Sequence, residues 1–443
     1  MLTKGSPLKF PFSVTLAVLL LAAARPQAHP GSNPTPMSPS DVKATFLQML
    51  DRPRVPLEAR TIETKPPMRG VIAEQVNFAV ERHPDGSIER VPALVVRTEH
   101  AKPGERMPAV IVLHGTGGRK EQMWPWLEQL AHRGILAIAI DGRYHGERAS
   151  GTQGTEAYNK AIVRAWRTKR GAPQEHPFYY DTCWDAWRTI DYLETRPDVD
   201  PNRVGMIGIS KGGIETWLAA AADDRVKLAI PAISVQSFRF GLDHGRWQAR
   251  ANTVREAHQA AADDLGRPTV DASVCEALWA KVIPGIRAIY DAPSMLRLFA
   301  GRPLLILNGE LDPNCPIDGA ELAFASARAA FHDADADDRL KIMVAKGAKH
   351  TVTHEQHDAA LDWCVTWLKP QIPEKFARFL RNRALAATVA GPPALRPRRG
   401  PSADRPEHPS RCRRPFGLRP ELVGPPILAP SAPAKLVKVA ATR

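Results

Sequence analysis

The sequence predicts an α/β protein with a mostly parallel central sheet and helices on both faces of that sheet. Three observations lead to this prediction. Aliphatic and β-branched runs alternate along the chain with segments of helical spacing, which is the pattern of βαβ units. Most of these runs are continuously apolar, as expected of strands buried on both sides. Several runs end in polar residues at the carboxyl end, where ligands bind in such sheets.

The expected elements follow one another in a simple order. Residues 71–80 and 90–97 flank the turn HPDGS, whose Asp-Gly pair favours an antiparallel hairpin. The remaining strands are expected at 107–115, 135–143, 204–210, 226–234, 303–312 and 340–350, and helices at 120–133, 179–195, 212–222, 319–331 and 355–369. Residues 235–302 carry helical patterns without a strong strand, so we expect a helical cap insertion after the sixth strand.

The positive charge of the chain is concentrated in its tail. The formal net charge is +13, but residues 384–443 alone contain 11 Lys and Arg against 3 Asp and Glu. The same segment holds 12 prolines, so we expect a disordered tail that buries little apolar surface. A basic face for nucleic acid is therefore not expected on the folded body, and no nucleic-acid partner is predicted.

The N-terminal segment has the layout of a secretory signal. Lys4 and Lys9 precede the apolar stretch from Val14 to Ala24, which ends in the small residues of an A-x-A cleavage pattern. We therefore expect a signal peptide at 1–24, a periplasmic or secreted product, and no membrane span after cleavage. If this segment is not a signal, the protein would be cytoplasmic.

Three further segments complete the predicted organisation. A leader with one helix is expected at 25–69, a catalytic domain at 70–383 that includes the cap at 235–302, and the tail beyond it. The five cysteines are widely spaced and form no C-x-x-C pair, so they are interpreted as small buried hydrophobes, although export would permit one or two disulfides.

The stretch Gly208-Ile209-Ser210-Lys211-Gly212 fits G-x-S-x-G, the tight strand-to-helix turn that presents a nucleophilic serine. Small residues are needed there because larger side chains would block the turn or the helix packing beneath it. The pattern alone also fits a glycine-rich turn with a solvated serine. Its context must therefore decide between the two interpretations.

Two other strand ends supply that context. Asp312 and His350 follow later apolar runs, in the chain order Ser, Asp, His. A serine hydroxyl needs a base to take its proton, and the base needs a carboxylate that orients it. We therefore predict a catalytic triad of Ser210, Asp312 and His350. Glu310, Asp318 and His354 are the nearest competing residues in the sequence.

Charge on a tetrahedral intermediate requires preorganised N–H donors. We assign these donors to the backbone N–H of Lys211, directly after the nucleophile, and to that of Thr116 in HGTGG. A dinucleotide-binding loop is excluded, because Lys120 occupies the sixth position of G-x-G-x-x-G. No metal site is expected at HEQH (354–357), which is one residue short of H-E-x-x-H, and a serine mechanism of this kind needs no metal or organic cofactor.

With these motifs the chain resembles the α/β-hydrolases, and within them the branch of dienelactone hydrolases, acetyl xylan esterases and prolyl-oligopeptidase-like enzymes. The resemblance covers about residues 70–370 and depends on HGTGG, DGRYHGER, RPDVDPNRVGMIGISKGG, NGELDPNCP and GAKH. It implies a serine esterase that cleaves a small-molecule carboxylic ester through an acyl-enzyme. The alternatives are a thioesterase or peptidase of the same fold, or a binding protein of this fold without turnover.

Four residues are candidates for lining the substrate pocket. His114 and Gly115 belong to the expected oxyanion loop, Tyr144 follows a strand, and Trp247 lies in the cap. The Lys211 side chain has two interpretations, as a cation on an exposed helix face or as a contact for an anionic substrate group.

Overall fold

A computed structural model describes residues 37–66, 69–152, 154–373 and 376. The chain divides into two compact units, Met1–Leu385 and Ala386–Arg443, and the described residues all lie in the first. The predicted signal at 1–24 and tail at 384–443 lie outside the described residues and stay predictions. Among the described residues, no helix has the length and apolarity required to span a membrane.

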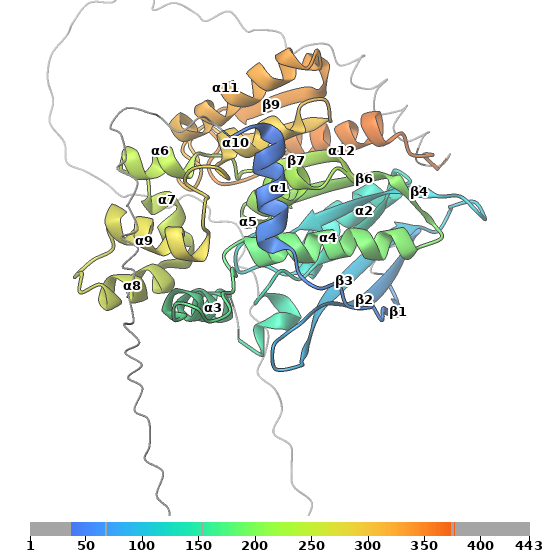
Figure 1. The fold of residues 1–443 in the computed structure, drawn as a ribbon. Helices are drawn as coiled ribbons and strands as arrows, with labels where there is room; N and C mark the ends of the chain where they lie inside the picture. The colour runs from blue at the N-terminus through green and yellow to red at the C-terminus, as the bar shows by residue number, and fades with distance from the viewer. Residues whose placement is uncertain (1–36, 67–68, 153, 374–375, 377–443) are drawn as a thin grey trace, which may run out of the picture. The chain divides into compact units, whose positions relative to one another are not determined.

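The described part of the chain is built on one nine-stranded mixed sheet (Figure 1). The strand order is β1-β2-β3-β5-β4-β6-β7-β8-β9, with antiparallel pairing from β1 to β5 through β2 and β3, and parallel pairing beyond. The strands are β1 (Arg60–Thr64), β2 (Val71–Arg82), β3 (Ile88–Thr98), β4 (Met107–Leu113), β5 (Leu136–Ile140), β6 (Val199–Ile209), β7 (Val226–Ala232), β8 (Leu304–Gly309) and β9 (Leu340–Ala345). The predicted mostly parallel sheet is confirmed.

Helices connect and cover these strands. The α-helices are α1 (Pro39–Leu50), α2 (Trp124–His132), α3 (Glu156–Arg167), α4 (Tyr180–Thr195), α5 (Lys211–Ala222), α6 (Phe238–Asp243), α7 (Gln248–Ala251), α8 (Arg255–Asp264), α9 (Ala272–Val282), α10 (Ala292–Leu296), α11 (Ile317–Asp333) and α12 (His354–Leu368). Short 3₁₀ helices are η1 (Lys120–Met123), η2 (Gly146–Ala149), η3 (Asn252–Val254), η4 (Arg297–Phe299) and η5 (Asp337–Arg339).

Both faces of the sheet are apolar, and each is covered by its own set of helices. Along β4, Ile111 and Leu113 belong to the core cluster that contains α1, α4 and α5, whereas Val110 and Val112 belong to the cluster under α2 and α12. All of these strand residues are fully or almost fully buried. This double burial explains why the sequence shows continuous apolar runs at the parallel strands.

The cap forms a helical group beside one end of the sheet, and it differs from the prediction in two ways. The insertion follows β7, the seventh strand rather than the sixth, because the short edge strand β1 precedes the expected hairpin. The sequence RTIET of β1 is mostly exposed, so it lacks the apolar run that would have revealed it. In addition, α3 packs against α8 and α9 of the insertion, although it lies far upstream in the sequence (Figure 1).

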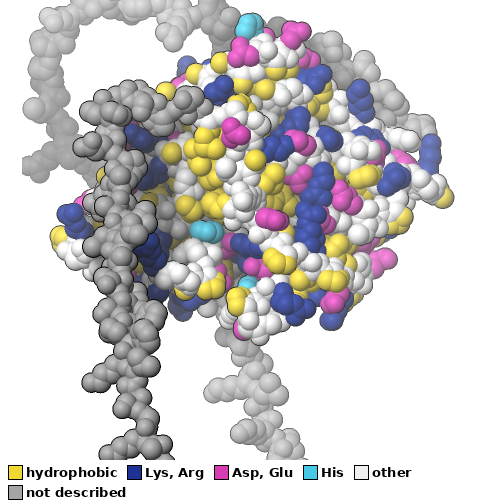
Figure 2. Space-filling model, in the orientation of Figure 1, with side chains coloured by type: hydrophobic (Ala, Val, Ile, Leu, Met, Phe, Trp, Pro, Cys, Tyr) yellow, Lys and Arg dark blue, Asp and Glu magenta, His cyan; other side chains and the backbone are white. Residues whose placement is uncertain are grey.

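The charges on the surface and the burial of the cysteines both agree with the sequence-based expectations for the folded body. On the face shown in Figure 2, basic and acidic side chains are interspersed over the described residues. Cys183, Cys275, Cys315 and Cys364 are free and buried, as expected of small apolar side chains. The fifth cysteine, Cys412, lies outside the described residues.

Candidate active site

Ser210 occupies the turn between β6 and α5. Its backbone has φ 57° and ψ −114°, a combination that non-glycine residues rarely adopt and that costs about 1–3 kcal/mol. The turn is held because the Ser210 N–H donates to the carbonyl of Ala232 at 2.9 Å, and the Ser210 carbonyl accepts from the N–H of Ile214 at 3.1 Å. The strained turn therefore places Ser210 between the last residue of β6 and the first residue of α5.

The two glycines of the motif are required by close packing. A Cβ atom added at Gly208 would lie 2.0 Å from the carbonyl oxygen of Gly212. A Cβ atom added at Gly212 would lie 2.3 Å from the carbonyl oxygen of Leu113, at the end of β4. Both distances are far inside van der Waals contact, so any larger residue would push α5 away from the strands.

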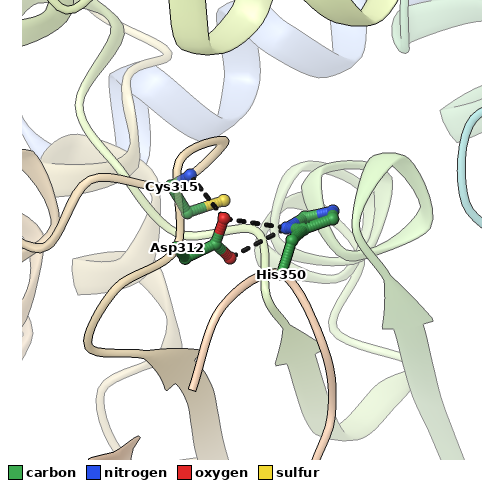
Figure 3. A group of neighbouring side chains, drawn as sticks. All are labelled: Asp312, Cys315 and His350. Carbon is green, nitrogen blue, oxygen red and sulfur yellow. Dashed lines mark hydrogen bonds and ion pairs between the residues drawn. The ribbon is translucent and has the colours of Figure 1, made fainter. Parts of the chain in front are cut away.

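The structure brings Ser210, His350 and Asp312 together from three different connections. His350 Nε2 lies 2.8 Å from Ser210 Oγ, and His350 Nδ1 lies 2.9 Å and 2.8 Å from the two Asp312 carboxylate oxygens. Figure 3 shows the Asp312 carboxylate facing the imidazole ring. The Asp312 side chain is fully buried, whereas that of His350 is 23% exposed. This is a continuous hydrogen-bonded chain from a carboxylate through an imidazole to a hydroxyl.

The loops that carry Asp312 and His350 pack on each other. The N–H of Leu311 donates to the carbonyl of Ala348 at 2.8 Å, so the segment after β8 stays close to the segment after β9. Gly309 permits this approach, because a Cβ atom there would lie 2.4 Å from the carbonyl oxygen of Lys349.

The competing residues have other surroundings. Glu310 accepts a hydrogen bond from the N–H of Gly347, and Asp318 pairs with Arg246. His354 begins α12 and is exposed.

The loop HGTGG lies directly beside the turn that carries Ser210. A Cβ atom added at Gly115 would lie 3.6 Å from the Cβ of Ser210. Within the described chain, the backbone N–H groups of Thr116 and Lys211 donate to no protein acceptor. Both groups are therefore available as donors to a ligand next to Ser210.

His114 has a defined neutral form. Its Nε2 accepts a hydrogen bond from the N–H of Gly142 at 3.0 Å, so the ring proton is on Nδ1, which donates to the carbonyl of Gly115 at 2.8 Å. Burial, and after it the nearby Lys211 ammonium, lower the pKa of His114 to about 3. The ring is only 2% exposed, which favours a supporting role over direct contact with a substrate.

The Lys211 side chain is neither on an exposed helix face nor in contact with solvent. It points into the core and pairs with Glu215, one turn along α5, with 2.5 Å between Nζ and Oε1 and 1% exposure of each side chain. The ammonium also lies 5.5 Å from the centre of the Tyr158 ring. Burial raises the pKa of Glu215 to about 7, and Lys211 opposes this shift. Both interpretations of the Lys211 side chain were therefore wrong, because neither considered an i, i+4 partner.

Tyr144 and Trp247 have partners of their own in the described structure. The Tyr144 hydroxyl donates to Glu175 at 3.0 Å, and the ring faces Arg164 with 5.3 Å between the guanidinium carbon and the ring centre. Trp247 is half-buried at the start of α7 and packs against the core. Their role as substrate contacts stays a prediction.

The segment around Tyr144 is held by a buried ion network. Arg143 donates to both oxygens of Asp185 and to Glu81, and Arg148 also pairs with Asp185. Asp185 keeps a lowered pKa despite its burial, because the two guanidinium groups stabilise its charge. This network explains the motif DGRYHGER as a scaffold for the loop next to His114.

Asp312, Cys315 and His350 also place three potential metal-ligand atoms within 4.8 Å of one another (Figure 3). Their donors do not fit a metal. The Asp312 carboxylate already accepts from His350, and from the backbone N–H groups of Asn314 and Cys315. The Cys315 thiol donates to the carbonyl of Ile233, and burial raises its pKa to about 12, so it is a poor metal ligand.

Two hollows open near the segments that carry the predicted site residues. One, of about 450 Å³, is lined by Gly117 and Gly118 of the HGTGG loop and by polar residues such as Gln122 and Thr152. The other, of about 580 Å³, is lined by Asp312 and by residues of the cap turn such as Arg246. The second hollow therefore reaches Asp312, and the first reaches the glycines that follow Thr116.

Comparison with known proteins agrees with this fold. Residues 81–238 match the family model of acetyl xylan esterase (AXE1). The acetyl xylan esterase 1 of Thermoanaerobacterium sp. JW/SL YS485 superposes with a TM-score of 0.53 at 17% identity, covering 76% of this chain and 96% of that chain. The chain has the α/β-hydrolase fold and is similar to acetyl xylan esterases over the matched segment. The family match and the fold together support a carboxylic ester hydrolase.

Two other proteins are similar over much of their length. The YtaP protein of Bacillus subtilis (strain 168) is 23% identical over 293 residues, which is 63% of this chain and 84% of that protein. The methylesterase BT1017 superposes with a TM-score of 0.51 at 16% identity, covering 80% of this chain and 76% of that chain. The predicted α/β-hydrolase fold is confirmed.

Sequence reasoning missed two contributors to the site. Glu215 neutralises Lys211, and an acidic residue four positions after the lysine could have been read as its i, i+4 partner. Cys315 supplies a backbone N–H to Asp312. A backbone donor leaves no signal in the sequence, because any residue except proline has one.

Proposed function

We propose that this protein is a serine esterase that hydrolyses small-molecule carboxylic esters through an acyl-enzyme intermediate. The observation that carries the proposal is the hydrogen-bonded chain of Asp312, His350 and Ser210, with 2.8 Å between His350 Nε2 and Ser210 Oγ. It lies at the carboxyl ends of parallel strands, where substrates bind in open α/β sheets.

Each group has a defined part in the reaction. Ser210 Oγ attacks the ester carbonyl while His350 Nε2 takes its proton and then passes it to the departing alcohol. Asp312 keeps His350 oriented and stabilises the imidazolium form. The N–H groups of Thr116 and Lys211 bind the oxygen that becomes negative. Water activated by His350 then cleaves the acyl-enzyme, which releases the carboxylic acid and returns the proton to Ser210.

The names of the similar proteins favour acetylated carbohydrates and methyl esters among possible substrates. The matched family model is that of acetyl xylan esterase, and one similar structure is a methylesterase. A thioesterase or a peptidase would use the same triad, so the acyl donor must be tested directly. Short acyl esters, acyl thioesters and aminoacyl amides should be compared side by side, with esters expected to give the highest kcat/KM.

Ser210→Ala tests the central assignment. The variant should retain below about 1% of the wild-type hydrolysis of p-nitrophenyl acetate, because the nucleophile is lost. Ser294→Ala, in α10, is the matched control and should keep full activity. A fluorophosphonate probe should label the wild type and not Ser210→Ala. Hydrolysis that survives the Ser210 substitution would contradict the proposal, and absence of labelling of the folded wild type would favour a binding protein.

Export is proposed on the N-terminal sequence alone. The protein isolated from its native cell should begin between residues 25 and 30, after cleavage near Ala24 or Ala28. N-terminal sequencing of the periplasmic or secreted fraction would test this. An intact Met1 in the cytosolic fraction would contradict it.

A further inference from the structure

The peptide between Gly115 and Thr116 is fixed from one side. The Gly115 carbonyl oxygen accepts two hydrogen bonds, from His114 Nδ1 at 2.8 Å and from the N–H of Gly118 at 3.0 Å. In a trans peptide the carbonyl and the following N–H point in opposite directions. The two donors therefore set the direction of the Thr116 N–H.

His114 is held by the next strand end. Its Nε2 accepts from the N–H of Gly142, two residues after β5, so the ring keeps both hydrogen bonds only while it is neutral and protonated on Nδ1. A protonated ring would place two donors, Nε2–H and the Gly142 N–H, against each other. The orientation of the Thr116 N–H thus depends on the charge state of His114 and on the position of Gly142.

The Lys211 ammonium lies close to the same residue, Gly142. A Cβ atom added at Gly142 would lie 2.9 Å from Lys211 Nζ and 3.6 Å from His114 Nε2. The ammonium therefore packs on the Cα of Gly142, beside the imidazole, and glycine is the residue that leaves room for it. Glu215 compensates the charge of the lysine, and the pair is sealed from solvent.

We infer that the buried Lys211–Glu215 ion pair is a positioning device for the oxyanion hole, acting on the Thr116 N–H through Gly142 and His114. The inference rests on the serine esterase function proposed above. Lys211 then contributes to both donors of the oxyanion hole. Its backbone N–H is one donor, and its side chain helps to orient the other, the Thr116 N–H. An ordinary buried ion pair would contribute to folding only and would have no effect specific to the transition state.

A double-mutant cycle tests this connection. The variant Lys211→Met/Glu215→Gln removes both charges and keeps the backbone N–H of residue 211, and His114→Ala removes the intermediate ring. We expect kcat to fall roughly 10-fold in the first and about 100-fold in the second, with KM changed less than about 3-fold. Combining them should leave kcat near the 100-fold loss, because the pair acts through His114. Losses that multiply to about 1000-fold, or that appear mainly in KM, would overturn the inference.

A matched control separates positioning from general destabilisation. Arg196 and Glu74 form another largely buried ion pair, with 2.6 Å between Arg196 Nη1 and a Glu74 oxygen, at the opposite end of the sheet. Arg196→Met/Glu74→Gln should lower the melting temperature and leave kcat unchanged. An equal loss of kcat in this variant would mean that the effect of the Lys211–Glu215 pair is structural.

A second variant is available if Lys211→Met/Glu215→Gln does not fold. A methyl group at Gly118 would lie 3.0 Å from the Gly115 carbonyl oxygen and 3.2 Å from His114 Nδ1. Gly118→Ala should therefore lower kcat without a matching change in KM, and its effect should overlap with that of His114→Ala. Fully multiplicative effects of these two substitutions would also contradict the inference.

The nitrogen resonances of His114 give a readout that does not require activity. In ¹⁵N spectra of the wild type, Nδ1 should be protonated and Nε2 not, and Lys211→Met/Glu215→Gln should disturb this pattern. An unchanged pattern in the variant would overturn the inference even if the esterase function is correct. If this variant shows the expected change but the wild type shows no hydrolysis that depends on Ser210, only the proposed function is contradicted.

Discussion

The backbone N–H of Cys315 donates to Asp312 Oδ1 across 3.1 Å, while the Cys315 thiol faces the carbonyl of Ile233, also at 3.1 Å. The residue therefore stabilises the carboxylate with its main chain and contributes nothing to it with its sulfur. Asn314 supplies a second N–H to the same oxygen at 2.8 Å. The turn after β8 thus fixes the carboxylate and leaves both of its oxygens facing His350.

This arrangement predicts that esterase activity is independent of divalent metal. Dialysis of the protein against EDTA should leave kcat/KM unchanged, because Asp312 and His350 are already bonded to each other. Cys315→Ala should keep kcat within about 3-fold, since the backbone N–H remains. Loss of activity on chelation, restored by adding a divalent cation, would contradict this prediction.

Asp312→Asn should impair catalysis without unfolding the protein. The amide keeps the shape of the side chain but stabilises the wrong tautomer of His350, and we expect kcat to fall by about 10⁴-fold. Steady-state kinetics with p-nitrophenyl acetate would measure the loss. Glu310→Gln, two residues away on the same loop, is the control and should have little effect. The reverse order of effects would mean that Glu310 is the acid of the triad.

Gly208→Ala should destabilise the fold and the site together. The added methyl group would lie 2.0 Å from the Gly212 carbonyl oxygen, so α5 must shift, at a cost of about 3 kcal/mol in the free energy of unfolding. Gly241, in α6, is a matched control, because a Cβ atom there meets nothing closer than 3.8 Å. Thermal unfolding should separate the two variants, and equal stability of both would contradict the packing account.

Buried neutral histidines should make the protein sensitive to acid. His258 Nε2 accepts from the Trp279 indole N–H at 2.9 Å, and burial lowers the pKa of His258 to about 4. The unfolded chain binds a proton near pH 6.5 and the folded protein does not, so this contribution is present above pH 6.5 and is lost as the pH falls toward 4. The cost is about 1.4 kcal/mol per pH unit for each such histidine.

His258→Phe should therefore make the pH dependence of stability less steep. The free energy of unfolding, measured with urea at pH 7 and pH 5, should fall by about 2 kcal/mol less in the variant than in the wild type. The absolute stability of the variant at pH 7 does not enter this comparison. Identical slopes would show that His258 takes up its proton equally in the folded and unfolded states.

The sequence predicted the structure best at positions where only one class of residue is physically possible. Continuous apolar runs located the parallel strands, and the spacing around Ser210 located the turn, because only small residues fit there. The edge strand β1 could not be predicted in this way, since only one of its sides is paired and its side chains are mostly exposed. The spacing of Lys211 and Glu215 could have identified them as partners, but the burial of this pair depends on packing between distant elements and could not be predicted.

The helix α3 could have been predicted from its own pattern. Tyr158, Ile162 and Ala165 repeat at helical spacing and are all buried. Its place against α8 and α9 is a tertiary contact between segments about a hundred residues apart, and no local pattern specifies such a contact.

That contact has a consequence for engineering the cap. The helical group beside the sheet is assembled from α3 and from the insertion after β7, two pieces of chain separated by α4, β6, α5 and β7. A chimera that exchanges only residues 235–302 with a related enzyme would place foreign helices against the resident α3. Transfer of substrate preference between relatives should therefore require exchange of both pieces, and the two should vary together when the enzyme is diversified in the laboratory.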